Sequence, residues 1–185
     1  MKKREPPRGS TTAATLQAAL ARAAELDITH LVVASTTGRT ALALARLLPS
    51  QMQAVCVTHH AGFSKPGKSE LSDETENKLA RFGISVLRTT HLFAGIDRAV
   101  RMKFGGLYPA EIVASTYRTF GEGTKVCVEI SVMALDAGLI PFGKDVIAIA
   151  GTGTGADTAL VIRPAHSRQF FDTRVREIIC KPASW

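Results

Sequence analysis

Short apolar runs alternate with longer segments of helical periodicity along most of the chain. The runs are rich in β-branched residues and are apolar at consecutive positions, which is typical of strands buried on both faces. Strands are expected at His30–Ser35, Gln53–Thr58, Ser85–Thr90, Asp145–Ala150, Thr158–Ile162 and Val175–Cys180. This alternation predicts a layered α/β fold with a mainly parallel sheet.

Segments with a helical apolar stripe separate most of these runs. They are expected at Thr12–Leu26, Thr40–Leu48, Asp73–Phe82, Ile96–Lys103, Ala110–Phe120 and Lys125–Ala137. Ser72 stands before the third helix, and Asp73 and Glu76 are placed for a capping box. No helix fits in the seven residues 151–157, and a parallel crossover needs about a dozen. The two strands flanking that segment should therefore be antiparallel, which makes the sheet mixed.

Length and charge divide the chain into two parts. Its 185 residues suit one domain, here residues 11–185, preceded by a basic arm over residues 1–10. The arm contributes +3 of the net charge of +7. A positive surplus favours anionic ligands weakly. Contact with nucleic acid through the arm is a minor alternative, because no basic run with interleaved aromatics follows it.

Composition excludes several other classes of protein. No apolar run reaches the ~18 residues of a membrane helix, and the N-terminus lacks the apolar region of a secretory signal. Cys56, Cys127 and Cys180 form no CxxC pair, so neither a disulfide framework nor a zinc knuckle is expected. We expect a cytoplasmic protein without a metal. The oligomeric state is left open, with a homo-oligomer among the options.

One loop carries the chemistry of a phosphate site. It leaves a buried strand, enters a helix and consists of Ser35, Thr36, Thr37, Gly38, Arg39 and Thr40. Ligands of open α/β sheets bind beyond the carboxyl ends of strands, and a helix start offers free N–H groups and the positive end of the helix dipole. The alternative is that these residues only cap the helix. Capping explains one or two of them, so we expect a phosphate site.

A glycine-rich turn follows the fourth strand and comprises Gly151, Thr152, Gly153, Thr154, Gly155, Ala156 and Asp157. It matches GxGxxA, but a dinucleotide fingerprint needs a helix next, whereas a strand is predicted. No lysine follows, so it is not a P-loop either. A plain tight turn and a backbone wall for the same ligand are both left open.

Further side chains could line the same pocket, namely Thr58, His59, Lys65, Lys68, His91 and Glu129. The loop after the second strand is long, which favours a function, although a solvated surface loop is equally compatible. Glu129 lies four residues after Lys125, so it is either an ion-pair partner or a cleft carboxylate. His59, His60 and His91 show no ligand spacing for a metal.

Several segments resemble a known family. The run LVVASTTGRTALALARLLPSQMQAVCVT is similar to the start of the pyruvate kinase C-terminal domain, where a comparable loop binds a sugar-phosphate effector, and DVIAIAGTGTGADTALVIRP resembles its glycine-rich ending. THHAGFSKPGKSELS, KVCVEISVMALDAGLIP and GTGTGADTALVIRPAHSRQFFDTRVREIICKP are similar to segments of stand-alone, mostly archaeal relatives of that domain. Position 27 is Asp, where these relatives favour Gly after the first helix.

The resemblance implies a fold more than an activity. It implies a three-layer α/β/α sandwich with strand order 3-2-1-4-5 and strand 5 antiparallel, which would bring the Ser35–Thr40 and Gly151–Asp157 loops together. Pyruvate kinase activity is not implied, because the catalytic barrel is absent from these residues. Some relatives are associated with flavin mononucleotide (FMN). We expect a protein that binds a phosphorylated small molecule, such as FMN, a nucleotide or a sugar phosphate. An enzyme using a flavin or a phosphorylated metabolite is the alternative.

Overall fold

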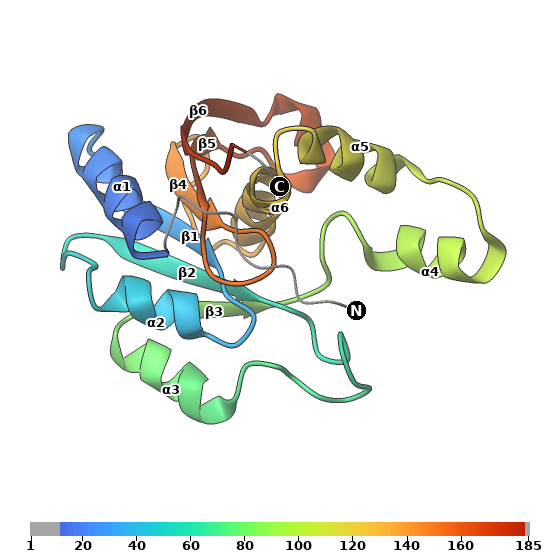
Figure 1. Ribbon diagram of the computed structural model, residues 1–185, viewed down its shortest axis with the longest axis horizontal. Coiled ribbons are helices and arrows are strands. Elements are labelled where there is room, and N and C mark those ends of the chain that lie inside the picture. The colour runs from blue at the N-terminus through green and yellow to red at the C-terminus, as the bar shows by residue number, and fades with distance from the viewer. Residues whose placement is uncertain (1–11, 184–185) are drawn as a thin grey trace.

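Six strands form one sheet in the computed structural model, which describes residues 12–183 (Figure 1). The basic arm expected at residues 1–10 lies outside these residues. The strands are β1 (His30–Ala34), β2 (Gln53–Thr58), β3 (Ser85–Arg88), β4 (Val146–Ala150), β5 (Thr158–Arg163) and β6 (Arg174–Cys180). Their order across the sheet is β3-β2-β1-β4-β5-β6. The order 3-2-1-4-5 is therefore confirmed, with one further strand at the edge.

The sheet is mixed, as the seven-residue connection before β5 required. β1 runs parallel to β2 and β4, and β2 runs parallel to β3. β5 is antiparallel to β4, and β6 is antiparallel to β5. Because β1, β2 and β4 are parallel, their carboxyl ends meet at the same edge of the sheet.

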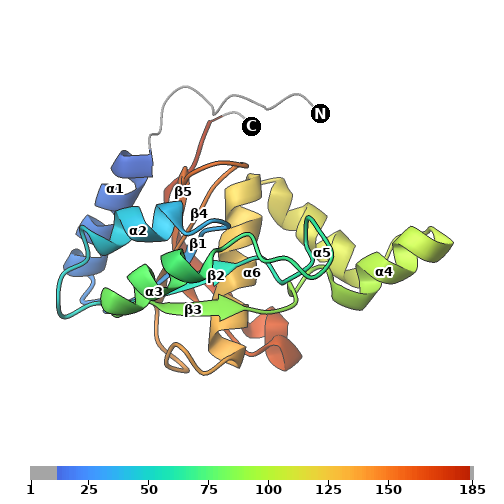
Figure 2. The same cartoon turned by 90° about the horizontal axis from the view of Figure 1, so that it is seen from below.

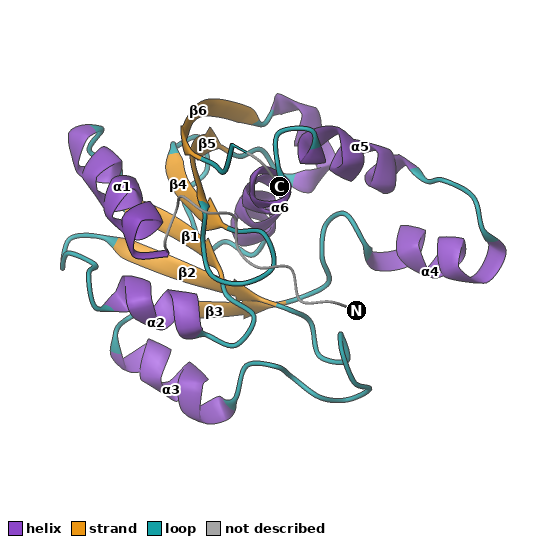
Figure 3. Cartoon of the chain, viewed as in Figure 1, coloured by secondary structure: helices purple, strands orange, loops and turns teal. Residues whose placement is uncertain are grey.

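Helices cover both faces of the sheet, which confirms the three-layer sandwich (Figure 2). One face carries α1 (Thr12–Glu25), α2 (Arg39–Ala45) and α3 (Asp73–Arg81), packed on a core that includes Leu16, Leu31 and Ile147. The other face carries α6 (Glu122–Asp136), packed on a core that includes Val32, Val128 and Leu160. The remaining helical elements are α4 (Gly95–Phe104), α5 (Pro109–Arg118) and the 3-10 helix η1 (Ser167–Asp172). Long loops join these elements (Figure 3).

Some element ends differ from the sequence prediction. α2 ends at Ala45, three residues before the predicted end, and α6 begins three residues before Lys125. The capping box at α3 is wrong in part. The Ser72 hydroxyl accepts from the Thr75 N–H, but Glu76 forms an ion pair with Arg88 of β3 at 2.6 Å instead of returning to the cap.

Position 27 adopts a conformation that glycine favours. Asp27 has a φ of 54°, in the left-handed region. Aspartate tolerates this region better than most residues, so the chain can turn from α1 into β1 without glycine.

None of the helices in residues 12–183 has the length and apolar character needed to cross a membrane.

Candidate functional site

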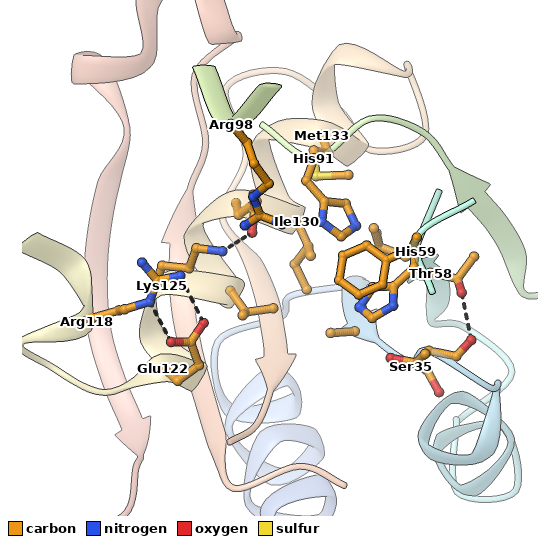
Figure 4. Close-up of a pocket in the computed structure, with 16 residues that line it drawn as sticks. Ser35, Thr58, His59, His91, Arg98, Arg118, Glu122, Lys125, Ile130 and Met133 are labelled. Atoms are coloured by element: carbon orange, nitrogen blue, oxygen red, sulfur yellow. Dashed lines mark hydrogen bonds and ion pairs between the residues drawn. The ribbon is translucent and has the colours of Figure 1, made fainter. Parts of the chain in front are cut away.

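A cavity of about 200 Å³ lies at the carboxyl ends of β1 and β2, on the face of the sheet that α6 covers (Figure 4). β1 and the loop after it contribute Ala34, Ser35 and Thr36. β2 and the loop after it contribute Val57, Thr58, His59 and Phe63. The other wall consists of His91, Arg98, Arg118, Glu122, Lys125, Val126, Glu129, Ile130 and Met133. The cavity therefore stands where ligands of open α/β sheets bind.

One face of α6 forms the wall opposite the strands. Its lining residues recur three and four positions apart, as residues on one side of an α-helix do. The first turns contribute the polar side chains of Glu122, Lys125 and Glu129, and the later turns contribute Ile130 and Met133. The cavity is therefore charged along one part of this wall and apolar along the rest.

Lys125 and Glu129 form a buried ion pair on this wall. The Lys125 ammonium lies 2.5 Å from Glu129 Oε2, and only 8% and 4% of the two residues is exposed. Glu129 Oε1 also accepts a hydrogen bond of 2.9 Å from the Phe93 N–H. Lys125 Nζ in turn lies 5.7 Å from the centre of the Phe93 ring. The pair thus holds the segment between β3 and α4 against α6 while lining the cavity.

His91 belongs to a cluster of rings at the cavity. Its ring centroid lies 5.2 Å from that of His59 and 5.6 Å from those of His60 and Phe63. The His59 ring stacks on Phe63 at 3.8 Å. Burial lowers the pKa of His91 to about 4, with further lowering by His59, Lys125 and His60, and the Glu129 carboxylate opposes the shift. His91 is therefore neutral at pH 7 and has a ring nitrogen whose lone pair can accept a hydrogen bond.

The low pKa of His91 predicts a pH-dependent stability. Because this pKa lies below the unfolded value of about 6.5, the unfolded state binds more protons between pH 6.5 and 4. Stability should fall as the pH drops through this window and level off below pH 4. His91 is partly exposed, and with solvent screening we expect a loss of about 1–2 kcal/mol. Urea unfolding at a series of pH values from 4 to 8 measures this loss in the free energy of unfolding. His91→Gln should flatten the profile above pH 5, and an unchanged slope would contradict the assignment.

Two arginines reach the cavity from α4 and α5. Arg118 forms an ion pair of 2.6 Å with Glu122. Arg98 points into the cavity from α4 and has no carboxylate partner within residues 12–183 (Figure 4). A guanidinium carries five N–H donors, so Arg98 retains its full capacity to bind an anion.

Only the first two residues of the predicted phosphate loop line the cavity. These are Ser35 and Thr36. The Ser35 hydroxyl accepts from the amides of Thr40 and Ala41 at 3.1 and 3.3 Å, so it caps α2. Thr58 Oγ1 donates to the Thr36 carbonyl at 2.8 Å. The amides of Thr36 and Thr37 donate no hydrogen bond within the described part of the chain. The Arg39 N–H likewise has no acceptor among the described residues, so the amides left for an anion lie on both sides of Gly38.

Gly38 serves packing rather than ligand approach. Its φ is +83°, and a Cβ there would come within 3 Å of side-chain atoms of Thr75 and Leu71. Its N–H donates to the Ser35 carbonyl at 3.4 Å. The helix-capping alternative accounts for Gly38 and Thr40, and phosphate binding by the amides on either side of Gly38 stays a prediction. Arg39 is exposed and does not line the cavity.

The glycine-rich turn lies at the same edge of the sheet as the first loop, because β1 and β4 are parallel, but it does not line the cavity. Its members are held by one another. Asp157 Oδ2 accepts from the Thr152 N–H at 2.9 Å, and a Cβ on Gly151 would lie 2.5 Å from the Gly155 carbonyl. The Ala156 N–H donates to Thr12 Oγ1 at 3.0 Å, which joins the turn to the start of α1. These contacts favour the tight-turn interpretation for Gly151, Thr152, Gly153, Gly155 and Asp157.

The structure divides the other predicted lining residues. Thr58, His59, His91 and Glu129 come together in the cavity. Lys65 and Lys68 are exposed on the loop after β2 and lie outside it. Glu70 fixes this loop by accepting from Ser64 and binding His59 Nδ1. Burial opposes ionisation of Glu70, but these hydrogen bonds prevail and lower its pKa.

Sequence reasoning missed Arg98, Arg118, Glu122 and Phe63 as cavity residues and treated Lys125 only as the partner of Glu129. The spacing of Glu122, Lys125 and Glu129 could have indicated one polar face on a buried helix. Arg98 and Arg118 gave no local signal. The sequences of α4 and α5 do not show that these two helices lie beside the ends of β1 and β2, which are distant in the chain.

Groups that could hold a metal are absent from residues 12–183. The cysteine thiols are free, and burial raises the pKa of Cys56 to about 12 and that of Cys127 well above its usual range. Neither thiol is therefore suited to act as a nucleophile.

Comparison with known proteins places this architecture in a wider context. The family model described as "pyruvate kinase, alpha/beta domain" matches residues 13–162. Among solved structures, a pyruvate kinase from Cryptosporidium parvum is similar, with 16% sequence identity and a TM-score of 0.45. The alignment covers 85% of this chain and 23% of that one, so the chain spans about a quarter of the length of that pyruvate kinase.

Proposed function

The chain belongs to the pyruvate kinase alpha/beta domain family, and from that premise we propose that it binds a phosphorylated small molecule in the cavity between β1, β2 and α6, without pyruvate kinase activity. The observation that carries this proposal is that three cationic side chains from three helices line the same cavity as Thr36, which has an unpaired amide. Arg98, Arg118 and Lys125 all line the cavity. An oxyanion is the ligand class that cations and N–H donors favour together.

Each cation offers donors to such a ligand. Arg98 has no carboxylate partner in the described residues, whereas Arg118 and Lys125 each use part of their donor capacity on a glutamate. Glu122 and Glu129 offset part of the positive charge, so an incoming phosphate would bind nearest Arg98. Arg98 then supplies the charge-assisted hydrogen bonds, and Thr36 supplies one backbone N–H at the end of β1.

The volume and the lining of the cavity limit which ligands fit in it. Sites for drug-sized ligands occupy about 300–1,000 Å³, so a cavity of about 200 Å³ accommodates a phosphate and the group attached to it. A sugar phosphate fits this description. The ring of a nucleotide or of FMN would extend past the cavity, toward the stacked rings of His59 and Phe63. Three free thiols in the described residues support a reducing, cytoplasmic setting.

A second candidate function is an enzyme acting on such a ligand. One observation favours it: neutral His91 lines the cavity beside the Lys125–Glu129 pair. Neutral His91 could hydrogen-bond a reacting group of a bound phosphorylated metabolite, with Lys125 stabilising the negative charge that develops. Yellow colour in the purified protein would indicate a bound flavin, and turnover of this flavin with a reductant would favour a flavin enzyme.

Nucleic-acid contact through residues 1–10 is a separate alternative. Deleting these residues should abolish it and leave binding of a small molecule unchanged.

A thermal-shift panel of sugar phosphates, nucleotides and FMN tests the binding proposal. A ligand at 100 times its Kd stabilises by about 2.7 kcal/mol, which raises the Tm by roughly 5–10 °C. Arg98→Gln should weaken the best ligand about 10- to 100-fold, because it removes charge-assisted hydrogen bonds. Titration calorimetry measures the change in Kd.

Arg39→Gln is the matched control, since Arg39 is an exposed arginine at the start of α2, outside the cavity. It should leave the Kd unchanged. If Arg39→Gln weakens binding and Arg98→Gln does not, the phosphate binds at the α2 loop and the cavity assignment is wrong. No shift with any phosphorylated ligand would contradict the proposal as a whole.

A further inference from the structure

The loop after β2 forms one wall of the cavity. It comprises residues 59–70, contains neither helix nor strand, and is named the lid (Figure 3). Its members His59 and Phe63 line the cavity. Long loops in compact domains are usually functional, and many act as lids on binding sites. The contacts that hold the lid therefore decide how freely a ligand reaches the cavity.

The hydrogen bonds of the lid are made almost entirely within it. The Gly62 N–H donates to the Lys68 carbonyl at 2.8 Å, and Glu70 binds two side chains of the same loop. Within the described part of the chain, the only hydrogen-bond partner outside the lid is the carbonyl of Leu71, the next residue. The ion pair of the lid is also internal. The lid is thus a self-contained unit that polar contacts do not fasten to the rest of the fold.

Ring contacts join the lid to the body of the protein. The His91 ring, which follows β3, has its centroid 5.2 Å from that of His59 and 5.6 Å from those of His60 and Phe63. Among the described residues, no other ring contact crosses from the lid to another part of the fold. Phe63 is 40% exposed and belongs to neither hydrophobic core. His91 is therefore the main point at which the lid is held.

We propose that the lid opens when His91 takes up a proton, so that acid uncovers the cavity. In the closed state the three rings of the lid pack around a neutral His91. The motion itself follows from these contacts, whereas its effect on a ligand rests on the proposed function.

A positive charge on His91 is unfavourable while the lid is closed. His59 and His60 of the lid and Lys125 of α6 oppose it, and Glu129 of α6 favours it. The Glu129 carboxylate is already bound to Lys125 at 2.5 Å, so it offsets a further cation only in part. Like charges that share a site disfavour the charged form. The remaining charged side chains of the cavity are Arg98, Arg118 and Glu122.

The sign of the pH effect follows from the two states of the lid. Burial is the largest cause of the low pKa of His91, about 4. Opening the lid admits water to this ring and removes the two lid imidazoles, so the pKa moves back toward its ordinary value of about 6.5. The open state then binds more protons between pH 6.5 and 4, and a falling pH favours it. The pair of His59 with Glu70 lies within the lid, so it preserves the shape of the lid without holding it closed.

Electron paramagnetic resonance of the doubly spin-labelled full chain measures this motion without any ligand. The labels are attached to Lys68→Cys on the lid and to Arg46→Cys at the end of α2, both exposed positions. Cys180→Ser removes the half-buried native thiol, and buried Cys56 and Cys127 remain unlabelled. One distance should dominate at pH 7.5. A second should grow on acidification, with the ratio of open to closed lid rising about 5- to 30-fold by pH 5.

Two variants connect the motion to His91. His91→Phe keeps a ring at this position but cannot take up a proton, so the first distance should dominate at both pH values. Phe63→Ala weakens the ring contacts without changing a charge, so the second distance should appear already at pH 7.5. His166→Phe is the matched control, because His166 is an exposed histidine that binds Asp136 outside the cavity, and it should behave like the wild type. Circular dichroism verifies that each variant is folded.

A single distance in the wild type at pH 5 would overturn the proposal, as would a second distance that persists in His91→Phe. The result is independent of the binding proposal, because no ligand is present. Failure of every phosphorylated ligand to bind would remove the proposed function and leave the lid motion standing. Ligand binding by a chain whose lid stays closed at pH 5 would do the reverse.

Discussion

Replacing Glu129 with leucine is expected to lower the free energy of unfolding by about 3–5 kcal/mol, because it leaves the buried Lys125 ammonium without its counter-ion. The Phe93 N–H loses its acceptor in the same variant. Both interactions are made by the Glu129 carboxylate, which holds the segment before α4 against α6. Urea unfolding at pH 7 measures the change.

The double variant Lys125→Met/Glu129→Leu separates charge from packing. Replacing a buried pair by apolar groups of similar size is often neutral, so the double variant should recover most of the lost stability. The Phe93 N–H stays without an acceptor, which sets the remaining deficit at about 1–3 kcal/mol. A double variant as unstable as Glu129→Leu alone would show that the ion pair is not the cause.

Gly38→Ala is expected to lower the free energy of unfolding by about 2–4 kcal/mol, through the cost of a positive φ and the overpacking of its Cβ. Thr75 and Leu71 stand where the methyl group would go. The effect should appear in urea unfolding without any ligand. A substitution of Gly38 therefore tests the fold and cannot serve as a test of phosphate binding.

Gly67→Ala is the control for this position. Gly67 has a similar φ of +69°, but nothing lies within 4 Å of its Cβ position. The Gly67→Ala variant has the conformational cost of a positive φ but no steric clash, so its free energy of unfolding should fall by only about 1–2 kcal/mol. Equal losses at the two glycines would contradict the packing role of Gly38.

The fold could be predicted from sequence because its signals are local and agree with one another. β1, β2 and β4 are continuous apolar runs, and the seven residues between β4 and β5 leave only an antiparallel turn. The helix ends were less predictable. α6 begins at Glu122, ahead of the first apolar residues of its stripe, where tertiary packing rather than local pattern decides the start.

Of the residues that line the cavity, those at or just after the ends of strands could be predicted from sequence. Thr58 ends β2 and His91 follows β3, and parallel pairing brings such positions together. Arg98 and Arg118 come from helices whose placement no local pattern encodes, so they were missed. Gly38 illustrates a related limit: a glycine that permits ligand approach and one that permits helix packing look the same in sequence, and only the structure shows that Thr75 packs against this one.

The described chain begins and ends at a single edge of the sheet. Thr12 is bonded to Ala156 of the glycine-rich turn, and Cys180, at the end of β6, is paired with Ala159 near the start of β5. This is also the edge where β1 and β2 end at the cavity. A reporter attached directly before Thr12 or after Cys180 would thus stand at the edge that carries the cavity, whereas one inserted in the turn before β4 would stand at the opposite edge.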